Sequence, residues 1–192
     1  MAIPVSVLQS TSPGSVIELF SIQLKTALHG ANTLYRFHNG ANLNANGEVV
    51  WAGNSYLRFP IDCSGFEFGS TGTLPRPKIS ISNIFGTITA IMQDVNETTV
   101  GNDLNGATFI RIRTLARYLD AANFTGGTNP FGTPDPTAEF PQEIYFLDRK
   151  VTETRDIVTW EAQSALDLVN VKLPQRIATK DIFPGIGAFL GF

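Results

Sequence analysis

The side chains best suited to catalysis in this sequence are one cysteine, Cys63, and two histidines, His29 and His38. An imidazole near a thiol can generate the reactive thiolate, so Cys63 with either histidine is the pair that a thiol hydrolase would need. Cys63 lies in the segment FPIDCSGFEF, where it alternates with polar neighbours as a half-buried strand residue does. Because free cysteine is among the most buried residue types, we favour a structural Cys63 over the hydrolase.

Metal and phosphate chemistry find little support in the residue spacing. The two histidines stand nine positions apart, and no third nitrogen or sulfur ligand is spaced to match them, whereas zinc sites usually need a third or fourth ligand. No glycine-rich loop followed by Lys and Ser or Thr is present to cradle a phosphate, and there is no nucleophile elbow. The sequence therefore predicts neither an enzyme nor a bound metal or cofactor.

Three arginines, Arg111, Arg113 and Arg117, fall on one face of the alternating segment TFIRIRTLARYLD. Such a stripe could pair with acidic groups of a neighbouring subunit or line a passage for nucleic acid. We favour cross-strand pairs within the chain, with acidic residues of the 143–168 segment such as Asp148, Glu153 and Asp156. The three arginines are kept as candidate interface residues, and the net charge of −3 does not indicate a nucleic-acid-binding protein.

A second binding hypothesis rests on the aromatic residues Trp51, Tyr56 and Phe59. Stacked on sugar rings, they would make the chain a glycan-binding β-sandwich module for host-surface recognition. Aromatic residues of a hairpin more often form core or cross-strand pairs, which is the interpretation we favour.

Strand-like alternation dominates the elements that must position these side chains. Glycine and proline are plentiful, with 17 and 11 residues, as in β-rich proteins with many turns. We predict strands and hairpins at 15–24, 46–59 (turning at Gly53-Asn54), 76–84, 108–120 and 143–168 (turning near 152–155). These elements predict a mainly β fold, a sandwich or barrel of about seven strands.

One segment departs from the strand pattern. In SNIFGTITAIMQDVN, apolar residues recur at three- and four-residue spacing, which predicts a flanking α-helix near 83–96. Ser82 or Asn83 is the expected N-terminal cap.

The stretch 123–141 contains four prolines and three glycines and predicts a long loop of functional or interface character. Its Pro130 and Phe131 are candidate interface residues. We expect three parts in the chain: an N-terminal arm at 1–14, a β-sandwich domain at 15–176 and an apolar arm at 177–192.

The segment IFPGIGAFLGF, residues 182–192, carries no charge. Burying its six large apolar side chains is worth very roughly 10 kcal/mol, while ordering eleven residues costs about 1–2 kcal/mol each in backbone entropy. The two sums are comparable, so the segment gains most from a preformed groove on an adjacent subunit. The candidate interface residues here are Ile182, Phe183, Ile186, Phe189, Leu190 and Phe192.

Two other locations for this segment stay open: packing within its own chain, and contact with a membrane. The strip is short and its one nearby basic residue is Lys180, so stable membrane anchoring is not expected. The first residues lack a basic region followed by an apolar core, and no apolar run approaches the ~20 residues of a spanning helix. We therefore expect no signal peptide and synthesis in the cytoplasm.

The order of these features resembles a known family. The run VVWAGNSYLRFPIDCSGFEFGSTGTLPRPKISISNIFGTITAI, followed by FIRIRTLARYLDAANF, is similar to the minor tail protein L family of lambda-like, long-tailed bacteriophages. Later segments, EFPQEIYFLDRKV and WEAQSALDL, fit the same order, so the resemblance covers roughly 20–176. It implies a fold like the tail-tube β-sandwich with a flanking helix.

The resemblance implies a structural protein of the virion tail tip, between the distal end of the tail tube and the central hub or receptor-binding apparatus. Implied partners are further copies in a ring, a distal tail protein and a hub protein, with DNA passing through the lumen but not bound specifically. Family members also carry a cysteine-rich C-terminal region that binds an iron–sulfur cluster. No cysteine follows Cys63 here, and four thiolates are the usual ligands, so we expect these residues to hold no cluster.

Overall fold

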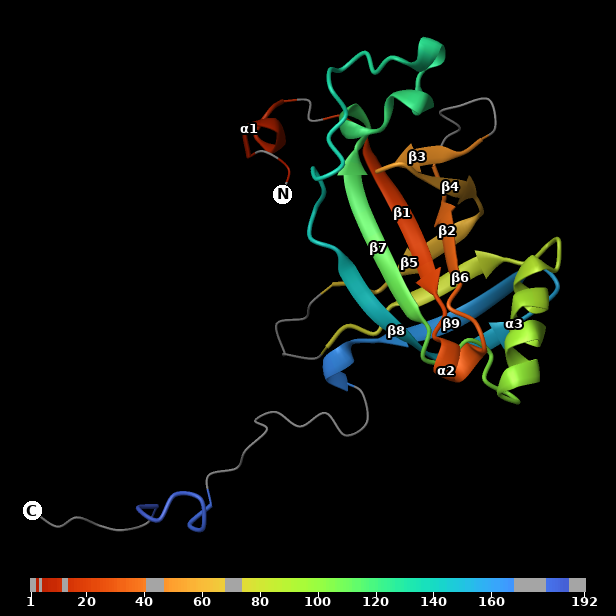
Figure 1. Ribbon diagram of the computed structural model, residues 1–192, viewed down its shortest axis with the longest axis vertical. Coiled ribbons are helices and arrows are strands. Elements are labelled where there is room, and N and C mark those ends of the chain that lie inside the picture. Colours follow the sequence, from red (N-terminus) through yellow and green to blue (C-terminus); the bar gives the residue numbers. More distant parts are fainter. Residues whose placement is uncertain are drawn as a thin grey trace, which may run out of the picture.

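The computed structural model describes residues 3, 5–11, 14–40, 47–67, 74–167 and 179–186. Its nine strands form one sheet in the order β3-β4-β2-β1-β7-β8-β9-β6-β5 (Figure 1). The strands are β1 (Val16–Gln23), β2 (Leu34–His38), β3 (Val49–Trp51), β4 (Asn54–Arg58), β5 (Ile61–Ser64), β6 (Lys78–Ser82), β7 (Thr108–Leu115), β8 (Glu143–Glu153) and β9 (Ile157–Gln163). The mainly β prediction is confirmed, whereas the expected seven strands fall short of these nine.

Helices are few among the described residues. The α-helices are α1 (Val5–Leu8), α2 (Thr26–His29) and α3 (Thr87–Thr98), and the 3-10 turns are η1 (Ala116–Tyr118), η2 (Ala121–Asn123), η3 (Thr125–Gly127) and η4 (Ala165–Asp167). Helix α3 is the predicted flanking helix, and its buried Ile88, Met92 and Val95 pack on the main core.

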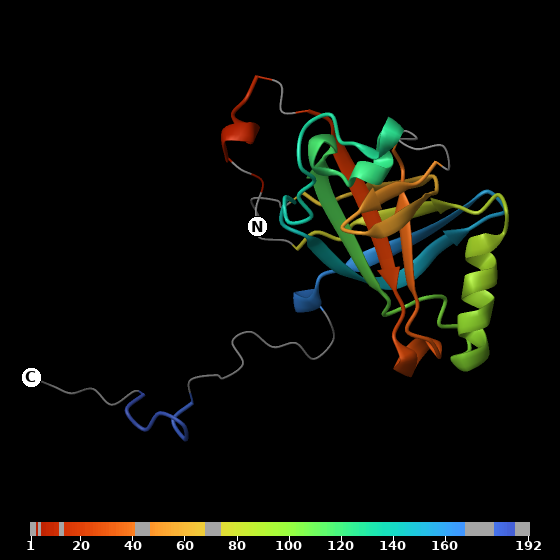
Figure 2. The same ribbon diagram turned by 45° about the horizontal axis from the view of Figure 1, so that its top comes forward.

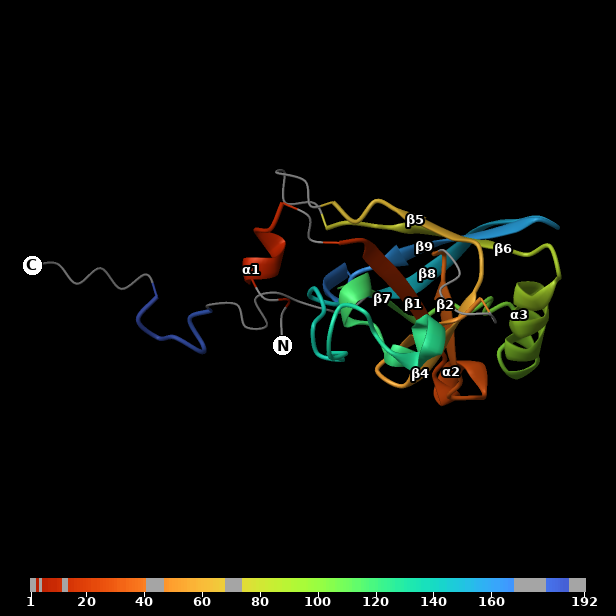
Figure 3. The same ribbon diagram turned by 90° about the horizontal axis from the view of Figure 1, so that it is seen from above.

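The sheet curls so that β5, β6 and β9 lie across β1, β2 and β7 as a second layer (Figure 3). The main core fills the space between the layers. Alternation places Ile79 and Ile81 of β6 inside, opposite Phe20 and Ile22 of β1, and Trp160 of β9 lies among them. Every second residue of these strands therefore points into the core, as the alternating sequence KISIS predicts for β6.

One bent stretch of chain links the two sides of this curled sheet. Strand β4 pairs in parallel with β2, and β5 pairs with β6, yet only Phe59 and Pro60 separate β4 from β5. The Phe59 N–H donates to the His38 carbonyl (3.0 Å), and the Ser82 N–H donates to the Pro60 carbonyl (2.9 Å). Proline has no N–H to leave unpaired, which suits it to this corner. The arrangement closes the sandwich into a barrel-like shape.

The β3–β4 hairpin covers the other face of β1 and β7, in front of β1 in Figure 2. Its Trp51 and Tyr56 pack with Leu19 and Ile112 in a second core. The hairpin was predicted, but its turn is Ala52-Gly53 rather than Gly53-Asn54. Both turn residues have positive φ, 51° and 73°, the geometry of a type I′ turn, and Asn54 already pairs with Trp51.

Helix α3 begins later than the spacing predicts. Gly86 adopts the left-handed backbone conformation (φ 68°) directly before Thr87, so the helix begins at Thr87 and residues 84 and 85 lie outside it. The predicted cap at Ser82 or Asn83 is wrong in position, because Gly86 occupies the N-terminal cap of α3 and makes no side-chain capping bond. The Asn83 Oδ1 atom nevertheless accepts the N–H of Thr89, in the first turn of the helix, at 3.2 Å. The β8–β9 hairpin matches its prediction, with strands joined at residues 154–156.

Candidate subunit interface

Two of the three predicted interface arginines lie in an ion network within the chain. The Arg111 guanidinium donates to Glu18 on β1 and, at 2.9 Å, to Glu143 on β8. Arg113 donates to the other Glu143 oxygen at 2.8 Å. The Arg111 guanidinium also lies over the Phe66 ring, 4.4 Å from its centroid. With 14% of its side chain exposed, Arg111 is committed to intramolecular contacts.

The favoured cross-strand pairing is therefore confirmed, but the acidic partners are different. Arg111 lies directly opposite Glu143 in the β7–β8 register, and this position decides the pairing. Of the acidic residues proposed from the sequence, Asp148 lies 3.7 Å from Arg76 and Glu153 is paired with Lys150. Asp156 makes no ion pair with any residue the structure describes.

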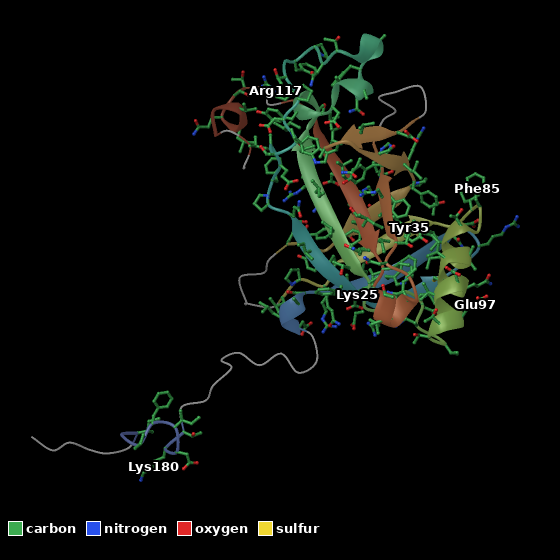
Figure 4. The ribbon with its side chains drawn as sticks, viewed as in Figure 1. Lys25, Tyr35, Phe85, Glu97, Arg117 and Lys180 are labelled. Atoms are coloured by element: carbon green, nitrogen blue, oxygen red, sulfur yellow. The ribbon has the colours of Figure 1, made fainter. Side chains whose placement is uncertain are left out.

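Arg117 does not share the arginine face, because β7 ends at Leu115 and Arg117 lies in the turn η1. Its guanidinium is 5.7 Å from the centroid of the neighbouring Tyr118 ring and forms no ion pair within the described part of the chain. Figure 4 shows Arg117 beside the long loop, at the end of the molecule away from α2. Of the three arginines, Arg117 has the charge most available to a partner.

The predicted long loop at 123–141 contains η3 and folds back on its own domain. The Asn129 amide donates to the carbonyls of Arg117 (2.9 Å) and Leu119 (3.0 Å), and Thr114 Oγ1 donates to the Ala138 carbonyl (2.7 Å). Pro130 and Phe131 lie at the exposed part of this anchored loop, and Phe131 packs edge-on against Phe124. The loop thus holds its two candidate contact residues in a fixed place facing solvent.

The apolar arm is described in part. Ile182, Phe183 and Ile186 are 51%, 49% and 42% exposed. The N–H groups of Ile182 and Phe183 both donate to the Thr179 carbonyl, so residues 179–186 form local turns. The other predicted interface residues of this arm lie outside the described residues: Phe189, Leu190 and Phe192.

The histidines have structural hydrogen bonds on both ring nitrogens. His29 Nδ1 accepts the Lys25 N–H (2.8 Å), and its Nε2 faces the Asn105 carbonyl (3.1 Å). His38 Nδ1 accepts the Gly40 N–H, its Nε2 faces the Gly47 carbonyl, and burial lowers its pKa. Neither ring is left with a nitrogen free to bind a metal or take a proton from a thiol.

Cys63 is half-buried on β5 and packs against the main core. Burial raises the pKa of its thiol to about 12, so the thiolate that a hydrolase would need is scarce near neutral pH. Among the described residues, no group of three or more metal-ligating side chains comes together. Within that same part of the chain, no helix is long and apolar enough to cross a membrane.

The aromatic platform proposed for glycan binding does not form. Trp51 is 2% exposed and Tyr56 is 4% exposed, because the β3–β4 hairpin presses both rings onto the second core. Phe59 packs at 5.4 Å, centroid to centroid, against Phe37. The structure therefore contradicts the glycan hypothesis based on these residues.

Sequence reasoning missed the aromatic side chain that is most exposed among the described residues. Phe85 is 90% exposed and its neighbour Ile84 63% exposed, in the turn before α3. The three- and four-residue spacing assigned Ile84 to the buried helix face. Gly86 directly after Phe85 was the available signal, because a glycine near a helix start often marks a break in the helix.

A profile of the family described as phage minor tail protein L matches residues 26–185. The chain belongs to this family. Tail tip protein L of Escherichia phage lambda is 39% identical over 93 residues, which are 48% of this chain and 37% of the relative. The matched stretch thus spans little more than a third of that relative's length.

Membership of the minor tail protein L family confirms the resemblance seen in the sequence. The residues that carried the resemblance make structural contacts. Trp51 fills the second core, and the Asn83 side chain accepts the Thr89 N–H of α3. Arg76 lies within ion-pair distance of Asp148, Glu161 and Asp167. Asn123, 1% exposed, holds the backbone of β3. Among the described residues of this tail protein, the residues that carry the family resemblance therefore stabilise the fold.

Proposed function

We propose that this chain is a structural protein of the phage tail tip, with its β-domain forming part of a ring. The ring would join the distal end of the tail tube to the central hub that carries the receptor-binding apparatus. Family membership and the name of the lambda relative support the location. The partners are other copies of the chain, a distal tail protein and a hub protein, assembled in the host cytoplasm.

The exposed arm carries this proposal. Ile182, Phe183 and Ile186 are held by local hydrogen bonds and face solvent, while the domain has complete cores of its own. Burying a large apolar side chain stabilises a complex by about 1.5–3 kcal/mol. Head-to-tail contacts of this kind, repeated through a closing rotation, produce rings.

The remaining surfaces supply contacts to the tube and hub. Exposed Pro130 and Phe131 sit on an anchored loop, and Arg117 beside them is free of ion pairs within the described chain. Arg111 and Arg113 are neutralised by acidic partners, and the net charge is −3, so DNA passing through a lumen would not be bound specifically. In the proposed role the protein joins other tail proteins by its shape and contacts, without catalysis and without stable membrane anchoring.

Deletion of residues 182–192 tests the proposal. We expect the shortened protein to keep the circular dichroism spectrum and unfolding midpoint of the parent but to fail to restore infectious particles to a phage lacking this gene. A matched control replaces exposed Val100 with Asp, at a site away from the arm. Normal tails containing the shortened protein would refute the role of the arm in joining subunits.

A further inference from the structure

Two apolar side chains stand out from the end of the domain that carries α3. Phe85 and Ile84 project from a four-residue turn, and Figure 4 shows Phe85 directed away from the helix. Single exposed apolar residues are common, but an adjacent pair of this size on a fixed turn marks a contact surface.

The turn is fixed by Asn83, which is 5% exposed. Its Nδ2 donates to Thr89 Oγ1 (2.8 Å) and to the Thr154 carbonyl (3.3 Å), and its N–H donates to the Asp156 carbonyl (2.8 Å). The Gly86 N–H closes the turn onto the Asn83 carbonyl at 2.7 Å. A surface held in this way loses little further freedom when a partner binds.

Beside the turn lies an open hollow of about 610 Å³, lined by residues 83–86, 89, 90, 93 and 153–155. We call it the Phe85 hollow. Its rim has one acidic group, Glu153, which also accepts hydrogen bonds from Lys150 (2.6 Å) and Thr89 Oγ1 (2.9 Å), and one basic group, Arg155. Arg155 forms no ion pair with any described residue. The hollow therefore offers the apolar side chains of Ile84 and Phe85 next to polar groups and to charges of both signs.

The arm has the complementary chemistry. Ile182, Phe183 and Ile186 follow directly after Lys180 and Asp181, and neither charged residue is paired within the described chain. An apolar segment next to one cation and one anion matches a hollow that presents Ile84 and Phe85 beside one anion and one cation.

The C-terminal end of the described domain lies away from the Phe85 hollow. Strand β9 leads into η4, where the described domain ends, and in Figures 1, 2 and 3 η4 and α3 lie on opposite sides of the sheet. The last element of the described domain therefore lies away from the hollow of the same copy. This polarity suits a contact between unlike surfaces of successive copies.

We propose that residues 179–186 of one copy dock in the Phe85 hollow of the next copy. This inference rests on the proposed function, because it names the surface that receives the arm. Phe183 and Ile182 pack against Phe85 and Ile84, while Lys180 and Asp181 face Glu153 and Arg155.

Disulfide trapping in full-length chains tests the contact. Gln93→Cys places a thiol in the hollow and Thr179→Cys places one on the arm, and neither change removes an apolar contact. Mixed chains with different tags should form the mixed disulfide roughly tenfold more than Val100→Cys with Thr179→Cys, because docking raises the local thiol concentration. Adding Phe85→Asp to the Gln93→Cys chain should abolish the excess, whereas adding Val100→Asp should not.

Tails built from a chain with both cysteines give the decisive readout. A ladder of linked copies supports the proposal, while a purely intrachain disulfide, or trapping no greater than with Val100→Cys, overturns it. If removal of 182–192 blocks tail assembly but Phe85→Asp assembles normally, the docking site is wrong and the proposed function stands. If the shortened chain assembles normally, the proposed function itself fails.

Discussion

The Asn123 side chain binds the backbone of Val50 as a neighbouring strand would. Its Oδ1 accepts the Val50 N–H and its Nδ2 donates to the Val50 carbonyl, both at 2.7 Å. Nδ2 also donates to the Asp120 carbonyl at 2.8 Å, and the Gly53 N–H donates to the Asp120 carboxylate at 2.7 Å. The segment after β7 therefore fastens the β3–β4 hairpin over the second core.

Asn123→Ala should lower the free energy of unfolding by about 1–3 kcal/mol, because it leaves the partly buried N–H and carbonyl of Val50 without the partners they have in the parent. Asn32→Ala, at an exposed position, should change it by less than about 0.5 kcal/mol. Urea denaturation followed by tryptophan fluorescence measures both. Equal stability of the two variants would show that the Val50 clamp is dispensable.

Arg111→Ala and Arg117→Ala should separate a structural arginine from one available to partners. Removing Arg111 leaves Glu18 and part of Glu143 unpaired near the core, and we expect a loss of about 1–3 kcal/mol. Arg117→Ala should stay within about 0.5 kcal/mol of the parent. Chemical denaturation gives both values, and a stable Arg111→Ala protein would contradict this assignment.

Cys63 should resist thiol reagents in the folded protein. With the pKa raised to about 12, the thiolate fraction at a pH of about 8 is on the order of one in ten thousand. Intact mass after treatment with iodoacetamide should show no adduct under native conditions and one adduct in urea. Rapid stoichiometric labelling of the native protein would revive the thiol-hydrolase hypothesis.

Acid should weaken the fold partly through Lys150. Its ammonium donates to Asp103 (2.8 Å) and Glu153 (2.6 Å), and these hydrogen bonds lower the pKa of both carboxyls. A lowered folded pKa means that this stabilisation is present above the unfolded pKa, near 4, and is lost as the pH falls through the folded pKa. These side chains are 24–31% exposed, and screening by the nearby solvent keeps the effect to about 1 kcal/mol.

Lys150→Met should therefore lose stability at about pH 7 and show a flatter decline towards about pH 3 than the parent. The measurement is the urea midpoint at each pH. Lys180→Met removes a charge that forms no ion pair with the residues the structure describes, so this variant should follow the parent curve throughout. A parallel decline in Lys150→Met would assign the acid sensitivity to other groups.

The spacing of apolar residues correctly predicted those strands and that helix in which buried residues recur at a regular interval. The alternation at Lys78–Ser82 and the long hairpin at 143–168 both appear where the two-residue repeat places them. The spacing of Ile88, Met92 and Val95 likewise identified the buried side of α3. Each of these signals lies within one segment, so a single sequence contains it.

Features set by distant contacts were not predictable in the same way. Ala52 adopts φ 51°, which is unfavourable for alanine, so the Gly53-Asn54 dipeptide was the better local choice for the turn. Burial of Trp51 depends on the hairpin folding over β1 and β7. The partner of Arg111 depends on strand register, which places Glu143 opposite it.

The corner at Phe59 and Pro60 also bears on how the domain comes apart. Because one short stretch hydrogen-bonds to β2 before the corner and to β6 after it, peeling Ile61 from Ile81 pulls on the residues that hold Leu57 against Phe37. Strands β4 and β5, near opposite ends of the strand order, are therefore expected to separate from the sheet together. Under a pulling force along this stretch, the domain should therefore unfold cooperatively rather than strand by strand.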